Sequence, residues 1–487
     1  MLFLLLALLC ALGLPACGED QGVSEQEGEV LIYAALNPVS PELEKSVKWF
    51  NNSHPDTQIE IRDYSDEGGL DRLRIELVLG QIPDIMELHY FGTSAERTGT
   101  NNSNIRSGNT HSWKYTNNST LERMPDEYWM PYQQLVQKGY LEDLWPYIEI
   151  DPELGRDGVL LPPLEAAEIN GGLYMLFTDF RINTLMGPES VVGDRCGWTL
   201  DELLETFATM SEDSTILRYN ATKWDIFYNL LSPILDQYVD RNSGECSFDS
   251  DDFRGLAEFL NRFPDEVDFE KLQQVEEEIL WSIRTGRQML EITQIAWASD
   301  IIYRDAYWQE RAAFVGYPTA DGSSGSSFYP MGDILAMSST CRNKDAAWEY
   351  IRRLIRPTRQ KKSNSALVAF VSIPVNLNDY ECFVWGCQVL LRENCEKYYP
   401  KDPLSWMIEW RPLTYGPAIK PMAFMTDEDV QRFETLLQNT TQLYWPEDDL
   451  SNIVWETLGA YFAGDRTLDD AIALIQNRVR LYVNENL

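Results

Sequence analysis

The histidines and the glycine-rich motifs are the first places to look for chemistry in this sequence. Only three histidines occur, His54, His89 and His111, and their spacing does not match the HExxH pattern of zinc hydrolases. Residues 322–326, GSSGS, are not the G-x-S-x-G turn that presents a nucleophilic serine. A GxxxxGK phosphate loop and a GxGxxG turn are also absent from the sequence. The sequence gives no positive sign of catalysis, so we expect a protein that is not an enzyme and needs no cofactor.

The acidic side chains dominate the charge of the chain. With 40 basic and 77 acidic residues the formal charge is 40 − 77 = −37. A nucleic-acid partner is excluded on this ground, because phosphate binding needs a basic face. Two carboxylates are enough for glycoside hydrolysis, but among 77 acids some pair can always be nominated. The acids by themselves therefore identify no active site.

Aromatic side chains are the most suggestive part of the composition. The chain has 15 Trp, 24 Tyr and 19 Phe, which together make up 12% of its residues. Sugars present C–H faces that pack on aromatic rings, and hydroxyls that hydrogen-bond to Asn, Asp, Glu or Arg. Most of these rings must fill the core, but the composition suits a protein that binds carbohydrate.

Eight cysteines occur, and two of them, Cys10 and Cys17, lie near the start of the sequence. An even number remains in the rest of the chain, which permits disulfides with 15 possible pairings; these are Cys196, Cys246, Cys341, Cys382, Cys387 and Cys395. The last three are close in sequence, but they form no Cys-x-x-Cys pair and have no histidine nearby. We therefore expect no zinc site and no other metal site.

Residues 2–14, LFLLLALLCALGL, form a run of 13 uncharged residues. This length fits the apolar core of a secretory signal and is too short to span a bilayer. The next residues, LPACG at 14–18, resemble a bacterial lipoprotein signal, although only Met1 precedes the leucines where Lys or Arg is usual. We expect residues 1–16 to be a signal peptide and Cys17 to carry lipid such as palmitate, with an acidic linker over 17–29. An ordinary cleaved signal and a buried helix are the alternatives.

The residues after the linker predict alternating strands and helices. Residues 30–35 form an apolar run typical of a buried strand, and Ser40-Pro41 is a helix start. A second strand follows near residues 59–61, then a helix over 70–77 and a third strand over 83–88. This order indicates a parallel sheet with crossover helices, so the fold class is α/β.

Two later segments carry their own signals. Residues 92–120 contain six Asn and hardly any aliphatic side chain, which indicates an inserted polar loop and not a domain. Thr199 and Glu202 have the spacing of a capping box and predict that a helix begins there.

Ligands of open α/β sheets bind beyond the carboxyl ends of the strands. That position is occupied by Asn37 after the first strand and by His89, Tyr90 and Phe91 after the third. We take these four residues as candidates for substrate binding.

A series of weak motifs in a fixed order gives a resemblance over nearly the whole chain outside residues 92–120. The segments include SPELEKSVKWFNNSHPDTQIEI, GQIPDIMEL, KGYLEDLWPYIE, NGGLYMLFTDFRINTL, GWTLDELLE, TGRQMLEITQIAWASDI, FVGYPTADGSSG, KDAAWEYIRRLI, SIPVN and AYFAGDRTLDDAIALIQNRVRLYVNE. In these segments the chain resembles the bacterial extracellular solute-binding proteins of family 1, the receptors of carbohydrate ABC importers. The maltose-binding proteins are distant relatives in this comparison.

The resemblance implies a two-lobe, periplasmic-binding-protein-like fold with the ligand cleft between the lobes. The first lobe would hold residues 30–180 and 317–365, with the 92–120 insertion, and the second would hold 181–316 and 366–487. Residues 179–181 and 316–318 would then be crossovers, about which the lobes close on the ligand.

The resemblance also adds candidate residues. It implies Trp297 as a stacking ring in the second lobe, while Asp179, Phe180 and Tyr329 are cleft candidates by their position at or near the crossovers.

The expected function is that of a monomeric, lipid-anchored receptor on the extracytoplasmic face of the cell membrane. It would capture a sugar or oligosaccharide and deliver it to the membrane subunits of an ABC permease. A surface glycoside hydrolase or other carbohydrate-modifying enzyme is the alternative, and a sensor or adhesin without a transport partner is a third reading.

Overall fold

The structure, a computed structural model, describes most of the chain but not all of it. The described residues are 29–66, 68–90, 113–115, 121–123, 128–130, 132–211, 214–217, 222–240, 244–265, 285–357, 372–405, 407, 421–445 and 448–486. The predicted signal peptide, Cys17, Phe91 and most of the predicted 92–120 insertion lie outside these residues.

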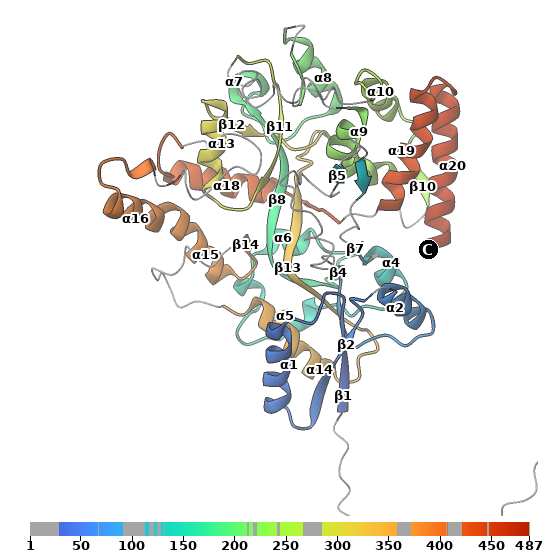
Figure 1. Ribbon diagram of the computed structural model, residues 1–487, viewed down its shortest axis with the longest axis vertical. Helices are drawn as coiled ribbons and strands as arrows, with labels where there is room; N and C mark the ends of the chain where they lie inside the picture. Colours follow the sequence, from blue (N-terminus) through green and yellow to red (C-terminus); the bar gives the residue numbers. More distant parts are fainter. Residues whose placement is uncertain are drawn as a thin grey trace, which may run out of the picture.

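A twisted nine-stranded sheet runs through the molecule, with the main order β11-β8-β13-β3-β1-β2 (Figure 1). Three shorter strands pair at its sides, β12 and β14 with β8, and β15 with β13. The bounds are β1 Glu29–Ala35, β2 Thr57–Asp63, β3 Ile85–Glu87, β8 Leu176–Pro188, β11 Glu291–Ile295, β12 Ala312–Phe314, β13 Ser327–Met337, β14 Ile373–Pro374 and β15 Gln442–Leu443. Strand β1 is parallel to both β2 and β3, which confirms the predicted α/β class.

The crossover helices begin where the sequence predicts. Helix α1, Pro41–Ser53, starts with the Ser40 hydroxyl accepting a hydrogen bond from the Leu43 N–H at 3.1 Å. Helix α2, Gly69–Val78, leads from β2 to β3. The capping box at the start of α8, Leu200–Ala208, is also confirmed: the Thr199 N–H donates to Glu202 at 2.8 Å, and the Glu202 N–H donates to the Thr199 hydroxyl at 3.2 Å.

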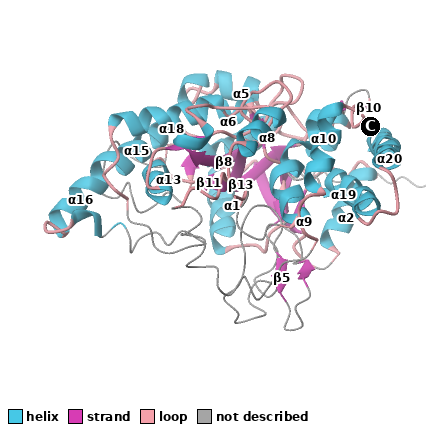
Figure 2. Cartoon of the chain, turned by 90° about the horizontal axis from the view of Figure 1, so that it is seen from above, coloured by secondary structure: helices cyan, strands magenta, loops and turns pink. Residues whose placement is uncertain are grey.

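The other helices pack around the main sheet, whose strands β8, β11 and β13 lie in the middle of the molecule when it is seen from above (Figure 2). The longer ones are α4 Tyr132–Gln137, α5 Trp145–Ile150, α6 Leu161–Glu165, α10 Asp251–Leu260, α13 Asp300–Trp308, α14 Lys344–Ile351, α15 Leu377–Trp385, α16 Leu391–Tyr398, α18 Asp427–Asn439, α19 Asp448–Phe462 and α20 Leu468–Asn486. Among the described helices, none combines the length and the hydropathy that a membrane crossing requires.

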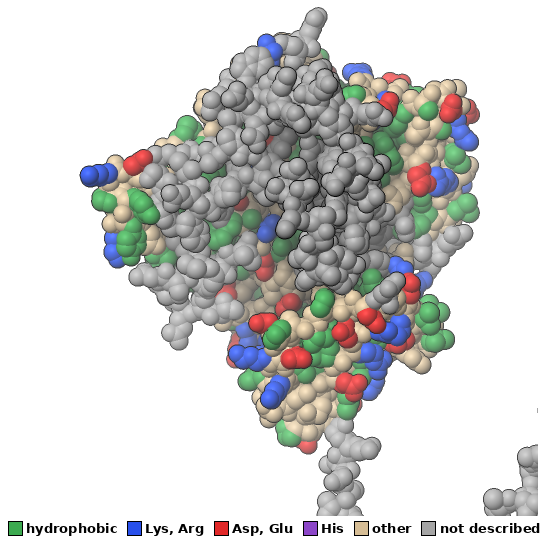
Figure 3. All heavy atoms as spheres, viewed as in Figure 1, with side chains coloured by type: hydrophobic (Ala, Val, Ile, Leu, Met, Phe, Trp, Pro, Cys, Tyr) green, Lys and Arg blue, Asp and Glu red, His purple; other side chains and the backbone are tan. Residues whose placement is uncertain are grey.

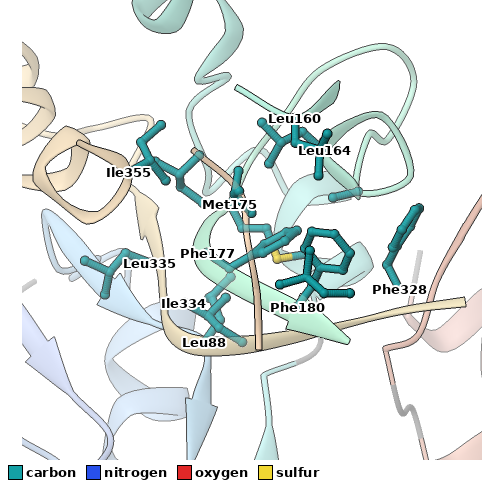
Figure 4. Packing of buried hydrophobic residues seen from close by; sticks show 14 of the residues in the cluster. Leu88, Leu160, Leu164, Met175, Phe177, Phe180, Phe328, Ile334, Leu335 and Ile355 are labelled. Atoms are coloured by element: carbon teal, nitrogen blue, oxygen red, sulfur yellow. The ribbon is translucent and has the colours of Figure 1, made fainter. Parts of the chain in front are cut away.

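Two hydrophobic cores lie along this sheet. The first contains β1, β3 and α1 and includes Phe177, Phe180 and Phe328, which pack closely in Figure 4. The second lies among α8, α10, α19 and α20, at the top and right of Figure 1. Burial of apolar surface drives each core to form, and two separate clusters indicate two bodies that the sheet joins.

Strand β8 passes from one core to the other. Its Phe177 belongs to the first core, whereas its Leu185 belongs to the second. The chain passes back in the segment that leads into β13, because Tyr317 belongs to the second core and Phe328, in β13, belongs to the first.

The chain also passes between the cores along β11, from Leu290 to Ile295, and between Leu437 of α18 and Leu450 of α19. Several segments, with β8 and β13 adjacent among them, therefore connect the bodies, and the lobe limits that the sequence suggested stay a prediction.

The first core also takes in residues that the predicted limits assign to the second lobe, among them Tyr380, Cys395 and Phe433. The reason is the pairing of β14 with β8 at Phe180, because α15 follows directly from β14. The six cysteines after Cys17 are all unbridged.

Acidic and basic side chains are interspersed on the described surface around β1, β2 and α1, in the lower part of Figure 3. Such mixing favours solubility and does not create the continuous positive face that nucleic acids require.

Candidate functional site

The carboxyl ends of β1 and β3 meet at Asn37 and Glu87. One oxygen of Glu87 accepts hydrogen bonds from the Leu36 N–H at 2.8 Å and from the Asn37 N–H and side-chain amide, both at 3.0 Å. The other oxygen accepts from the Tyr33 hydroxyl at 2.9 Å. The Asn37 amide also donates to the His89 carbonyl at 2.8 Å. Glu87 therefore fixes the loop after β1, and with it the predicted binding residue Asn37.

Burial affects the ionisation of Glu87 and Tyr33. Desolvation raises the pKa of Glu87, and the hydrogen bonds from Asn37, Tyr33 and Leu36 oppose that rise. Desolvation, followed by the charge of Glu87, raises the pKa of Tyr33 well above its ordinary value. Tyr33 therefore keeps its proton and acts as a hydrogen-bond donor to the carboxylate.

A bulge in β13 brings Asp333 to the same edge of the sheet. The register between β13 and β8 shifts between Met331 and Ile334, so Gly332 and Asp333 stand outside the regular ladder. Gly332 has φ +72°, and a Cβ there would lie 1.9 Å from the Thr178 hydroxyl. Only glycine fits this close approach of the two strands.

Asp333 follows Gly332 in this bulge. Its side chain is exposed to solvent, yet desolvation and the charge of Asp179 raise its pKa. Asp333 also contributes to the raised pKa values of Tyr33 and Tyr350, which puts it within electrostatic reach of Glu87 and its partners.

Asp179 of β8 pairs with Met331 of β13, just before the bulge. Its Oδ2 accepts a hydrogen bond from the Thr178 hydroxyl at 2.8 Å. Its Oδ1 is buried and has no hydrogen-bond partner among the residues that the structure describes. A buried carboxylate oxygen without a donor is costly, so a donor from outside the described chain would be stabilising at this point.

A row of polar side chains continues from Asp179 along one face of the sheet. Asp179, Arg181 and Asn183 alternate along β8 and therefore point to one side. The Arg181 guanidinium donates to Gln294 of β11 at 2.7 Å, and the Gln294 amide donates to Asn183 at 2.9 Å. Tyr329 of β13 pairs with Arg181 and shares this side. We call these five residues the polar face.

The predicted candidates differ in where the structure puts them. Asn37 lies at the strand ends, while Asp179 and Tyr329 belong to the polar face, where the Tyr329 ring stacks on Tyr444 with centroids 5.6 Å apart. Trp297 follows β11 and is half-buried. Its ring centroid is 5.8 Å from that of Phe383, and its backbone N–H donates to the Asp300 carboxylate at 2.9 Å.

Two other candidates are more deeply buried. His89 is only 3% exposed. Phe180 is completely buried on the side of β8 opposite the polar face, where it meets Phe328 edge-on at 5.1 Å. The Tyr90 side chain and Phe91 lie outside what the structure describes.

Sequence reasoning missed Glu87, Asp333, Arg181 and Gln294 as site residues. Glu87 and Gln294 lie inside segments that were recognised, but only the strand register reveals which side they face. A glycine within a strand is a known sign of a bulge, and Gly332 is the signal that could have located Asp333.

The described residues contain no group of three or more His, Cys, Asp or Glu side chains placed to hold a metal ion. The donors and acceptors at the strand ends suit hydrogen bonding to a polar organic ligand, because carboxylates, amides and a guanidinium are combined with tyrosine rings.

Comparison with known proteins gives no match to a family model, and no match to a curated protein sequence. Among solved structures the chain is similar to a putative oligosaccharide periplasmic-binding protein from Synechococcus sp. MITs9220, with 14% identity, TM-score 0.47, and 93% of this chain and 99% of that chain covered. It is also similar to the sugar-binding protein MalE from Xanthomonas citri, with 11% identity, TM-score 0.46, and coverage of 94% and 98%.

A third similar structure is an extracellular solute-binding protein of family 1 from Alicyclobacillus acidocaldarius, with 12% identity, TM-score 0.44, and coverage of 94% and 98%. These are proteins of the class that the sequence resembles. At such identities and TM-scores they establish neither the family nor the ligand of this chain.

Proposed function

We propose that the chain is an extracytoplasmic substrate-binding protein that captures a sugar or oligosaccharide between two bodies and delivers it to an ABC importer. The observation that carries this proposal is the passage of β8 and β13 between two separate hydrophobic cores, with polar side chains gathered where they cross. Strands that pass between two bodies provide a connection about which hinge closure around a ligand takes place.

The site chemistry supports a carbohydrate as the ligand. Asn37, Asp179 and Arg181 offer hydrogen bonds to hydroxyl groups, and Tyr329 offers a ring face to C–H groups. Trp297 stays a candidate stacking ring, because it is half-buried and follows the strand that carries Gln294.

A thermal-shift screen over mono- and oligosaccharides tests this proposal. A ligand that binds only the folded state raises Tm, with about 2.7 kcal/mol gained at 100 times Kd. At least one carbohydrate should stabilise the chain, and Asp179→Asn should reduce that shift. Absence of a shift with every carbohydrate would contradict the proposal. Release of reducing sugar that depends on Asp179 or Asp333 would replace it with the hydrolase alternative.

The membrane anchor belongs to the same proposal. Lipid on Cys17 would keep the receptor near its permease, and stable anchoring needs more than one acyl chain. Labelling cells with a radioactive fatty acid should mark the native chain and leave Cys17→Ala unmarked. Equal labelling of both would reject Cys17 as the anchor and would leave the sugar-binding proposal untouched.

A further inference from the structure

The hydrogen bonds on the polar face have a fixed direction. A guanidinium can only donate, so the side-chain oxygen of Gln294 is the atom that accepts from Arg181 at 2.7 Å. The Gln294 NH2 group is then turned toward Asn183 and donates to its side-chain oxygen at 2.9 Å. This bond occupies the acceptor of Asn183 and leaves its NH2 group as a donor. The direction of the bonds therefore makes both Arg181 and Asn183 donors toward a ligand.

Arg181 has no acidic partner among the described residues, which sets it apart from two other half-buried arginines. Arg352 binds the carboxylates of Asp151 at 2.7 Å and Glu349 at 2.9 Å, and Arg432 binds two carboxylates as well. The Nε of Arg181 is buried and has no hydrogen-bond partner in the described part of the chain. Because a buried charged donor without an acceptor is costly, a carboxylate at this point would be stabilising.

Two buried hydroxyls lie beside these donors. Ser327 is 4% exposed and pairs with Asn183, and Ser372 is 1% exposed. Strand β14 pairs antiparallel with β8 at Phe180, and one further step of this register puts Ser372 beside Arg181, on its side of the sheet. Neither hydroxyl has a hydrogen-bond partner among the described residues. Since buried polar groups in native proteins are almost always paired, both hydroxyls are further donors for an acceptor-rich ligand.

Three other charges surround this group. Arg304 of α13 donates to the backbone carbonyl of Gln294 at 3.4 Å, so a second guanidinium lies at the residue that holds Arg181. The Asp300 carboxylate accepts from two backbone N–H groups of the turn before α13. Asp179 shares the side of Arg181, two residues and thus about 7 Å away along β8. The net charge of −37 is screened within about 8 Å at physiological salt. The local groups therefore favour an anion at Arg181 and a hydroxyl at Asp179.

We propose that the polar face selects an acidic sugar, such as a uronate or its oligomer, whose carboxylate binds Arg181 with the Asn183 NH2 group beside it. This inference rests on the proposed sugar-binding function and specifies its ligand class. A carboxylate only accepts hydrogen bonds and matches the planar fork of a guanidinium, so it suits a face of donors better than hydroxyls, which also need acceptors. Gln294 is a positioning residue, because it directs both donors without a charge of its own.

Free and esterified ligands of one size provide the test. Methyl esterification of a glucuronate or galacturonate oligomer removes its negative charge and keeps its sugar rings. Isothermal titration calorimetry at neutral pH should show at least tenfold tighter binding of the free acid for one of the two oligomers, and added salt should weaken binding of the acid more than of the ester. Equal affinities of acid and ester, or tighter binding of the ester, would overturn the inference.

Matched variants sharpen it. Arg181→Gln should weaken binding of the free acid at least tenfold and change binding of the ester far less. Gln294→Glu should also reduce the acid-to-ester affinity ratio, because the new carboxylate pairs with Arg181 and cannot donate to Asn183. Arg466→Gln, at an exposed arginine between α19 and α20, should change neither affinity.

Circular dichroism verifies that the variants fold, and the two site substitutions on different strands give independent readings. Arg181→Lys keeps the charge but not the planar fork, so it should retain only part of the acid-to-ester ratio. An unchanged ratio in both Arg181→Gln and Gln294→Glu would overturn the inference.

The sugar panel separates this inference from the proposed function. A neutral sugar that stabilises the chain, while acidic sugars do not, would reject the acidic ligand and keep the receptor proposal. Failure of every carbohydrate would reject both.

Discussion

Over residues 179–182 the two sides of β8 differ sharply, although these residues alternate along one strand. On one side Phe180 and Ile182 are completely buried and pack with Phe328. On the other side Asp179 and Arg181 are partly exposed and carry buried atoms without described partners. The apolar side joins the strand to the first core, so it fixes where the polar side lies. A ligand-binding face at a crossing between two bodies thus needs a packed opposite face, because the connection would otherwise lack a defined orientation.

The largest expected effect comes from breaking the packed side. Phe180→Ala should cost about 3–5 kcal/mol of unfolding free energy, because it removes a buried ring from a close-packed core. Urea denaturation measures this loss. Asp179→Asn, one residue away on the polar side, is the matched control and should cost much less. Similar losses in both variants would contradict the assignment of the two sides.

A second prediction concerns the bulge that positions Asp333. Gly332→Ala should cost about 2 kcal/mol or more, because alanine is strained at φ +72° and its Cβ would lie 1.9 Å from the Thr178 hydroxyl. Adding Thr178→Ala should recover part of this loss by removing that hydroxyl. Denaturation of the single and double variants tests the pair, and an additive effect with no recovery would show that the close approach is not the cause.

A third prediction concerns the hydrogen bond that Tyr33 donates to Glu87 at 2.9 Å. Tyr33→Phe should cost about 1 kcal/mol, because the carboxylate loses a buried donor. It should also raise the pKa of Glu87 further, since this bond lowers it in the native chain. Denaturation and a carboxyl titration followed by NMR measure the two effects. No change in either would mean that Tyr33 does not support Glu87.

The smallest expected effect is a pH dependence in Asp333→Asn. The pKa of Asp333 is raised in the folded chain, so ionisation of this group favours the unfolded state. The variant should therefore melt slightly higher than the native chain at neutral pH. The difference should shrink as pH falls through the raised pKa and vanish below the ordinary pKa of Asp. A constant difference at all pH values would contradict the electrostatic cause.

Local signals in the sequence were enough for much of the fold. The apolar run that became β1, the Ser40-Pro41 start of α1 and the capping box at Thr199 act within a few residues, so their predictions are confirmed. Asn37 was predicted in the same way, because the position after a buried strand can be read from the sequence alone, and as a binding residue it stays a prediction.

The rest of the site depends on contacts between distant segments. Leu335 of β13 pairs with Glu87 of β3, and this pairing brings Asp333 to the end of β3. Which residues share a face is equally hidden, because a register slip of one residue exchanges the two sides of a strand. Phe180 and Asp179 were for this reason equal candidates by sequence, whereas the structure puts them on opposite sides.

The distance between the two bodies tests the central claim most directly. Spin labels at Lys48→Cys on α1 and Glu258→Cys on α10 would report it, since both positions are exposed and the helices belong to different cores. Cys196→Ser and Cys246→Ser would remove the more accessible native thiols. Pulsed electron spin resonance should give a shorter distance when a stabilising carbohydrate is bound, because the bodies close about the β8–β13 connection. An unchanged distance with every such ligand would contradict the account.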